Sequence, residues 1–168
     1  MDKTKEIGNS LVEVLVAVIV LSVAALGAAG MQITSKKATH EAQQRFIATY
    51  LANDMMEKIR NNPSAQATYA EGDLTGATIA SAPETNCSDG NTCSSEELAH
   101  YDRWLWEQAL VKNLIEPTGC ITIDADRLIK IVVVWWGAEA LESHGAGNDC
   151  GSVGEHRRSV MNISFIDN

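Results

Sequence analysis

An uncharged apolar segment near the start of the chain constrains the fold more than any other feature. From Val14 to Met31 the sequence reads VLVAVIVLSVAALGAAGM, with no charged residue. A helix rises about 1.5 Å per residue, so this segment covers roughly 27 Å, close to the thickness of a bilayer core. We therefore expect a membrane-spanning helix at about residues 14–31.

The residues around this segment bear on whether it is a retained anchor or a cleaved secretory signal. A secretory signal needs a short apolar region followed by small residues at the cleavage site, and residues 25–30, Ala-Leu-Gly-Ala-Ala-Gly, satisfy that pattern. That interpretation leaves Glu13 unexplained, because a carboxylate costs up to about 3 kcal/mol at the bilayer centre and less near its edge. We therefore favour a retained helix in which Glu13 has a charged partner.

The six residues that lead into the apolar segment carry a specific resemblance. Gly8-Asn9-Ser10-Leu11-Val12-Glu13 resembles the class III signal of type IV prepilins, whose pattern is Gly, usually Phe, Ser or Thr, Leu, an aliphatic residue and Glu. Five of the six positions fit, and Asn9 departs from the pattern, in which Phe or Met is common. The resemblance implies that prepilin peptidase cleaves between Gly8 and Asn9 and methylates the new N-terminus. It also implies that Glu13 pairs with the terminal amine of a neighbouring subunit.

The helical pattern continues beyond the apolar segment until Pro63, because proline interrupts the hydrogen bonding of a helix. Large apolar residues recur at every fourth position, with polar residues between them: Ile47, Leu51, Met55 and Ile59. A single helix from Ser10 to Arg60 would be about 76 Å long. It would be apolar on all sides in its first half and amphipathic in its second.

These patterns predict three parts of the chain. Residues 1–8 form a prepilin leader, residues 9–62 form a spine helix that is partly transmembrane, and residues 63–168 form a globular domain. Within that domain, residues 64–91 are rich in small and polar residues and predict a loop. Ser94 and Glu97 have capping-box spacing and predict a second helix that runs to about Leu114.

The last third of the chain is rich in β-branched and aromatic residues. It predicts an antiparallel meander of three strands, at Cys120–Asp124, Leu128–Gly137 and Ser159–Ile166. The fold class is therefore α+β, with a long N-terminal helix packed on a small antiparallel sheet and a second, short helix. A polar stretch from Glu139 to Arg158 predicts a surface loop between the second and third strands.

Four cysteines, all downstream of the apolar segment, predict disulfides and an oxidising compartment: Cys87, Cys93, Cys120 and Cys150. Their spacing does not match that of zinc ribbons, so we expect no metal. Three connectivities are possible. We expect one bridge from Cys87 to Cys93, across a short turn, and a second from Cys120 on the first strand to Cys150 in the following loop. The domain then faces the periplasm.

Charge and chemistry exclude other function classes. Thirteen Lys and Arg against 22 Asp and Glu give a formal charge of −9, which disfavours direct nucleic-acid binding. No nucleophile elbow or phosphate loop occurs in the sequence, and no two histidines share one rigid face. The histidines are His40, His100, His144 and His156. We therefore expect a protein that is not an enzyme and binds no cofactor.

The downstream spacing adds to the resemblance. The paired cysteines, Tyr101-Asp102 with Trp106, and the Pro117-Thr118-Gly119 turn before a strand ending in Trp resemble minor pilins of the PilV kind. This implies a minor pilin that helps to initiate or prime a type IV pilus and is incorporated in the fibre or at its tip. Its partners would be major and minor pilins, contacted through the N-terminal helix. Before assembly it would cross the inner membrane once, and afterwards it would belong to the extracellular pilus.

Two alternatives stay open. A minor pseudopilin of a type II secretion system shares the signal and the spine helix, while the chain length and the two cysteine pairs favour the pilus. A periplasmic binding module tethered by an uncleaved anchor is the less favoured alternative. Such a module has no use for Glu13, and the sequence provides no flexible linker before the globular domain.

Overall fold

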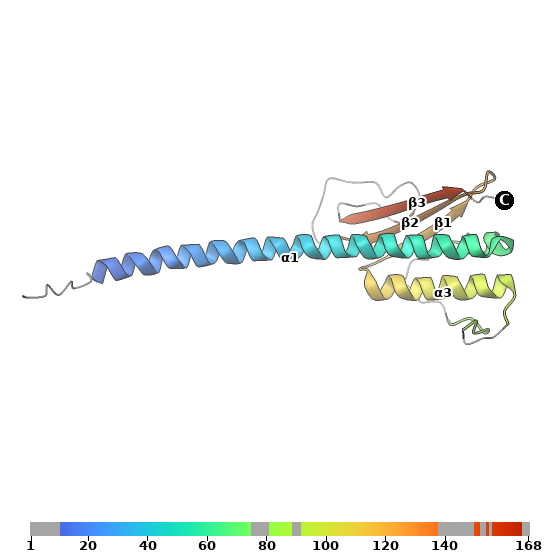
Figure 1. Ribbon diagram of the computed structural model, residues 1–168, viewed down its shortest axis with the longest axis horizontal. Coiled ribbons are helices and arrows are strands. Elements are labelled where there is room, and N and C mark those ends of the chain that lie inside the picture. The colour runs from blue at the N-terminus through green and yellow to red at the C-terminus, as the bar shows by residue number, and fades with distance from the viewer. Residues whose placement is uncertain are drawn as a thin grey trace, which may run out of the picture. The chain divides into compact units, whose positions relative to one another are not determined.

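A computed structural model describes residues 11–74, 81–88, 92–137, 150–151, 154 and 156–165. Figure 1 shows the order of its helices and strands. The elements are α1 (Leu11–Asn61), the 3-10 turn η1 (Pro63–Ala65), α2 (Gln66–Tyr69), α3 (Ser95–Asn113), β1 (Thr118–Ile123), β2 (Leu128–Trp136) and β3 (Arg157–Phe165). The chain divides into two compact units between His40 and Glu41, a division that falls within α1.

The described part of the first unit is helical and exposed from residue 11 to residue 40. Its most apolar window has a mean hydropathy of 2.6 and buries none of its residues within the protein. Polar side chains inside the apolar stretch are bonded to their own helix: the Ser22 hydroxyl donates to the Val18 carbonyl at 2.7 Å. By length and composition, this helix can cross a membrane.

The second unit is built on a three-stranded antiparallel sheet in the order β1-β2-β3. One face of this sheet, together with α1 and α3, forms the main apolar core, in which Ile129, Ile131 and Val133 are fully buried. Figure 1 shows the C-terminal turns of α1 running alongside α3, next to the strands. The predicted fold class, with a sheet, a long helix and a second helix, is confirmed.

Trp106 is central to this core. Its indole nitrogen donates to the Leu51 carbonyl of α1 at 2.9 Å, and only 1% of its surface is exposed. The ring lies against Gly119 on β1, where an added Cβ would come within 2.5 Å of Trp106 Cζ3. Glycine at this strand position therefore lets α3 approach the sheet closely.

Local signals explain where several elements begin and end. The Ser94 side chain accepts from the Glu97 amide and the Glu97 side chain accepts from the Ser94 amide, so the predicted capping box is confirmed at the start of α3. The turn between β1 and β2 depends on Asp124, whose carboxylate accepts from the amides of Asp126 and Leu128. α1 ends at Asn61, one residue after the predicted end.

The structure corrects two boundaries. Residues 64–69, predicted as part of a loop, belong to η1 and α2, because Pro63 suits the first position of a helical turn and Tyr69 is buried against the core. Thr118 and Gly119, predicted as part of a turn, belong to β1. Both pair with β2, Thr118 with Val134 and Gly119 with Val133, and Gly119 also exchanges two backbone hydrogen bonds with Leu74, at 2.8 and 2.9 Å.

The third strand also begins earlier than expected. Arg157 and Arg158, predicted to belong to the preceding loop, both lie in β3. Arg158 pairs with Trp135 in the ladder, and its guanidinium contacts Glu41 of α1 at 2.6 Å. The strand is extended by ladder pairing and by this ion pair, neither of which the local composition reveals.

Candidate assembly helix and the polar network of the globular unit

Glu13 lies in the first turn of α1 and is the only acidic residue there. Its neighbours Leu11, Val12 and Val14 are all more than half exposed. An acidic side chain near a helix N-terminus is favoured by the helix dipole. Among the described residues Glu13 has no ionic partner, so the charge on this apolar surface can pair with a cation from another molecule. The predicted processing residues Gly8 and Asn9 lie outside the described residues.

The surface around Glu13 is suited to association with lipid or with other apolar helices. Apolar side chains cover the described helix on all sides between residues 11 and 34, and among the described residues none of these side chains is buried within the chain. A surface of this kind is stable in lipid or against other apolar helices. Glu13 adds one fixed charge by which a helical neighbour can be placed in register.

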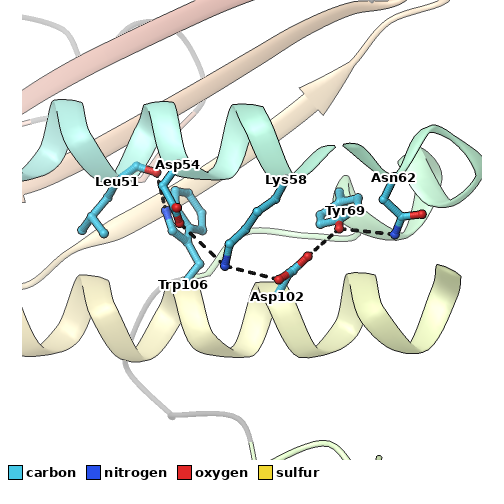
Figure 2. Close-up of polar contacts among 7 residues, drawn as sticks. All are labelled: Leu51, Asp54, Lys58, Asn62, Tyr69, Asp102 and Trp106. Carbon is cyan, nitrogen blue, oxygen red and sulfur yellow. Dashed lines mark hydrogen bonds and ion pairs between the residues drawn. The ribbon is translucent and has the colours of Figure 1, made fainter. Parts of the chain in front are cut away.

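In the second unit, a network of polar side chains connects α1, α2 and α3 (Figure 2). The Tyr69 hydroxyl donates to Asp102 Oδ2 at 2.7 Å, and Lys58 Nζ lies 3.3 Å from Asp102 Oδ1. Lys58 also lies 3.6 Å from Asp54. Asn62 donates to the Tyr69 hydroxyl at 3.4 Å. Asp102 therefore contacts side chains from both α1 and α2 while lying on α3.

Burial determines the protonation of this network. Desolvation raises the pKa of Tyr69 well above its usual range, and the neighbouring Asp102 raises it further, while the hydrogen bond from Asn62 lowers it. The phenol therefore stays protonated and keeps donating to Asp102. Because Tyr69 is fully buried, the network is a structural connection inside the globular unit.

Arg103, next to Asp102, holds the segment that follows α2. Its guanidinium donates to the carbonyls of Thr68 at 2.7 Å and Gly72 at 3.2 Å, and to that of Glu71. Burial lowers the pKa of Arg103. A buried guanidinium that donates to several carbonyls is compensated for its lost hydration, so it fixes this segment against α3.

Sequence reasoning found only part of this network. Asp102 and Trp106 were noted through a family resemblance, whereas Lys58, Asn62 and Tyr69 were not. A local signal existed: Asp102 lies one helical turn before Trp106, on the same face of α3 as the buried Trp106 and Leu110. A charged residue on a face that is otherwise apolar predicts a buried polar partner.

The structure pairs Cys87 with Cys93 and Cys120 with Cys150, which is the expected connectivity. Cys120 and Cys150 are buried with Val132 and Val134 on the face of the sheet away from the main core. Cys87 and Cys93 are partly exposed in the segment before α3.

The described histidines lie in separate parts of the chain. His156 stacks on Trp136 with ring centroids 4.8 Å apart, and its Nδ1 lies 3.1 Å from the Gly137 carbonyl. His40 and His100 lie on different helices, and His144 lies outside the described residues. Among the residues that the structure describes, no group of three or more His, Cys, Asp or Glu side chains could hold a metal ion.

Comparison with models of known protein families gives a match over part of the chain. Residues 30–104 match the model of a protein family described as Tt1218-like, type IV pilin Tt1218. No curated protein and no solved structure matches the chain.

The match supports a type IV pilin, and the long apolar helix, the three-stranded antiparallel sheet and the second helix are consistent with the type IV pilin fold. Pilins contact other pilins in a pilus, and the exposed apolar helix is compatible with a membrane anchor. The matched range begins after Glu13, so the residues that carry the expected processing and assembly chemistry lie outside it.

Proposed function

We propose that this protein is a minor pilin of a type IV pilus, of the PilV kind, that helps to initiate or prime assembly and is incorporated in the fibre or at its tip. The observation that carries the proposal is that one carboxylate, Glu13, lies on an apolar helical surface that none of the described residues covers. The family match over residues 30–104 supports a pilin subunit.

The physical basis is an exchange of environments. Residues 14–31 are stable in the inner membrane before assembly, and the same apolar surface packs against similar helices of other pilins in a fibre. Prepilin peptidase would cleave between Gly8 and Asn9 and create a terminal amine on each subunit. An amine of this kind on a neighbouring pilin would pair with Glu13 and offset part of the cost of burying its charge.

The proposed location follows from the same helix. The chain crosses the inner membrane once, and the globular unit, with its two disulfides, lies in the oxidising periplasm until the subunit joins an extracellular pilus. The partners are major and minor pilins and the peptidase. In this proposal the protein acts through its surfaces rather than through catalysis or a cofactor.

The pseudopilus of a type II secretion system is the second candidate function. It uses the same helix and the same charge, so the globular unit alone does not separate the two. Among the available observations, the family description as a type IV pilin favours the pilus.

Replacing Glu13 tests the proposal. Glu13→Gln keeps the size of the side chain and removes its charge, so we expect normal membrane insertion and folding with fewer pili per cell. Glu57→Gln is the matched control, because Glu57 also lies on α1, is exposed, and among the described residues pairs with Arg60 of the same helix. It should leave pilus number unchanged.

Two further results distinguish the alternatives. Gly8→Val should block processing, which N-terminal sequencing of the membrane-extracted protein detects; a mature terminus near Met31 in the unsubstituted protein would contradict a pilin of any kind. If Glu13→Gln and a full deletion both leave piliation unchanged while protein secretion across the outer membrane fails, the protein is a pseudopilin.

A further inference from the structure

The two disulfides differ in how readily a reagent can reach them. Cys120 and Cys150 are 5% and 2% exposed and lie in an apolar cluster with Val132 and Val134. Cys87 and Cys93 are partly exposed. No described residue between 81 and 94 belongs to an apolar core cluster. A thiolate must approach a sulfur along the S–S bond to break it, so accessibility separates the two bridges.

Residues on both sides of the exposed bridge bind one carboxylate. The Thr85 hydroxyl, before Cys87, donates to Glu97 Oε1 at 3.0 Å. The Ser94 amide, after Cys93, donates to Glu97 Oε2 at 2.8 Å, and the Glu97 amide donates back to the Ser94 hydroxyl at 3.2 Å. The chain before Cys87 and the chain after Cys93 are therefore joined twice, once by the disulfide and once by their shared hydrogen bonds to Glu97. Glu97 belongs to the first turn of α3.

These hydrogen bonds also stabilise the charge on Glu97. The bonds from the Ser94 amide and hydroxyl, and then that from Thr85, lower the pKa of Glu97. The carboxylate therefore stays ionised and accepts at both oxygens.

The start of α3 is in turn bonded to the end of α1. Asn62 directly follows the last residue of α1, and its side-chain amide donates to the Ser95 carbonyl at 2.7 Å. Asn62 is buried, and its amide also reaches Tyr69 in the polar network. The segment closed by the exposed bridge is thus connected, through Ser94 and Ser95, to the point where α1 ends.

We infer that the Cys87–Cys93 disulfide is a reducible latch that holds the first turn of α3 against the end of α1, while Cys120–Cys150 is the permanent structural bridge. A dithiol opens the latch: its two thiols supply two electrons and two protons, the S–S bond breaks to give two cysteine thiols, and the dithiol becomes a cyclic disulfide. Thr85 then separates from Glu97, and Ser94 is no longer held by the bridge at Cys93.

The test uses the full chain in detergent without denaturant, treated with dithiothreitol for increasing times. New thiols are alkylated and located by peptide mapping. Accessibility predicts that Cys87 and Cys93 are labelled at least about tenfold faster than Cys120 and Cys150. Amide exchange is followed by NMR at Glu97 and Leu98, whose amides donate to the Ser94 hydroxyl and the Ser94 carbonyl.

Opening the latch should raise exchange at these two amides several-fold and leave exchange unchanged at Leu110, within the same helix. Replacing Cys87 and Cys93 together by Ser should give the same pattern without reductant. Thr85→Val keeps the bridge and removes one contact to Glu97, so it should give a smaller increase at the same amides.

Two outcomes would overturn the inference. Equal labelling rates for the two bridges would show that the exposed one is no more reducible. Selective reduction with unchanged exchange at Glu97 and Leu98 would show that the bridge does not hold α3. If the double-serine protein fails to accumulate, the time course on the unsubstituted protein decides between these results.

Discussion

Two parts of the same helix, residues 11–40 and residues 41–61 of α1, have the same backbone and very different surroundings. In the first part every residue is exposed. The second part buries one side: Gln44, Ala48, Leu51, Ala52, Met55, Met56 and Ile59. Val20 in the first part and Tyr50 in the second have nearly equal exposure, 63% and 62%.

The comparison shows that two side chains with equal exposed fractions can require different surroundings, water in one case and lipid or another helix in the other. Burying apolar area contributes about 25 cal/mol per Å², and the second part obtains this contribution from its own globular unit. Tyr50 lies on the side of the helix that faces away from the globular unit's core, where contact with water is not unfavourable. The first part is apolar on all sides, so its stability depends on lipid or on other helices. Substitutions can separate these two cases.

The largest effect is expected from Trp106→Ala, which breaks the packing that the second part of α1 depends on. Losing a buried Trp side chain costs about 3 to 5 kcal/mol, and the Leu51 carbonyl also loses the hydrogen bond from the indole. Urea unfolding of the detergent-solubilised protein measures the change. Trp136→Ala is the control, because Trp136 is 39% exposed and should cost clearly less. Equal losses for the two would contradict the central role of Trp106.

The next effect separates the two kinds of exposure directly. Val20→Asp places a carboxylate at the middle of the apolar segment, which should cost about 3 kcal/mol of membrane insertion. Tyr50→Asp makes the same change at nearly equal exposure and should leave insertion intact, with stability altered by less than about 0.5 kcal/mol. Alkaline carbonate extraction of membranes measures retention. Loss of retention in both variants would mean that the second part also contacts lipid.

Periodicity explains why much of the fold could be predicted from sequence. The row of apolar residues from Ile47 to Ile59 identified the packed side of α1, and the Ser94 capping box identified the start of α3. The dense β-branched sequence at 128–136 identified β2. Each of these signals is local, so it is visible without knowing which segments meet.

The parts that sequence missed depend on segments far apart in the chain. Tyr69 is buried because α3 lies across it, and Gly119 is required because Trp106 occupies the space of a side chain. The position of Arg158 in β3 depends on Glu41, 117 residues earlier. For the candidate site, Glu13 was evident from a short motif, whereas the partners of Asp102 come from two other helices and no spacing rule links them.

A smaller effect is expected from Asp102→Asn, which tests how the packed part of α1 is joined to α3. The change removes the charge that faces Lys58 and weakens the acceptor for Tyr69, at a cost of about 2 kcal/mol. Asp54→Asn is the matched control, since Asp54 also contacts Lys58 but is more exposed, and it should cost less than about 1 kcal/mol. Urea unfolding of both proteins checks the order. The reverse order would show that the Lys58 interaction depends mainly on Asp54.

The smallest effect at neutral pH is expected from Tyr69→Phe, and it has a distinctive pH dependence. At pH 7 the variant loses one hydrogen bond to Asp102, worth about 1 kcal/mol. Because burial raises the pKa of Tyr69, the phenol is protonated in both folded and unfolded protein below its usual pKa near 10. Above that pH the unfolded chain loses the proton while the folded protein keeps it. Stability therefore falls as pH rises, by at most about 1.4 kcal/mol per pH unit for one proton.

Tyr69→Phe should remove this contribution, so the difference in stability between the variant and the unsubstituted protein should shrink between about pH 10 and 11. Tyr50→Phe is the control, because Tyr50 is exposed and lies outside the polar network around Asp102, so its curve should stay parallel to that of the unsubstituted protein. Urea unfolding at pH 8, 9, 10 and 11 gives the curves. Parallel curves for Tyr69→Phe would mean that the phenol ionises as easily in the folded protein as in the unfolded chain, and the connection from α2 to Asp102 would then be open to water.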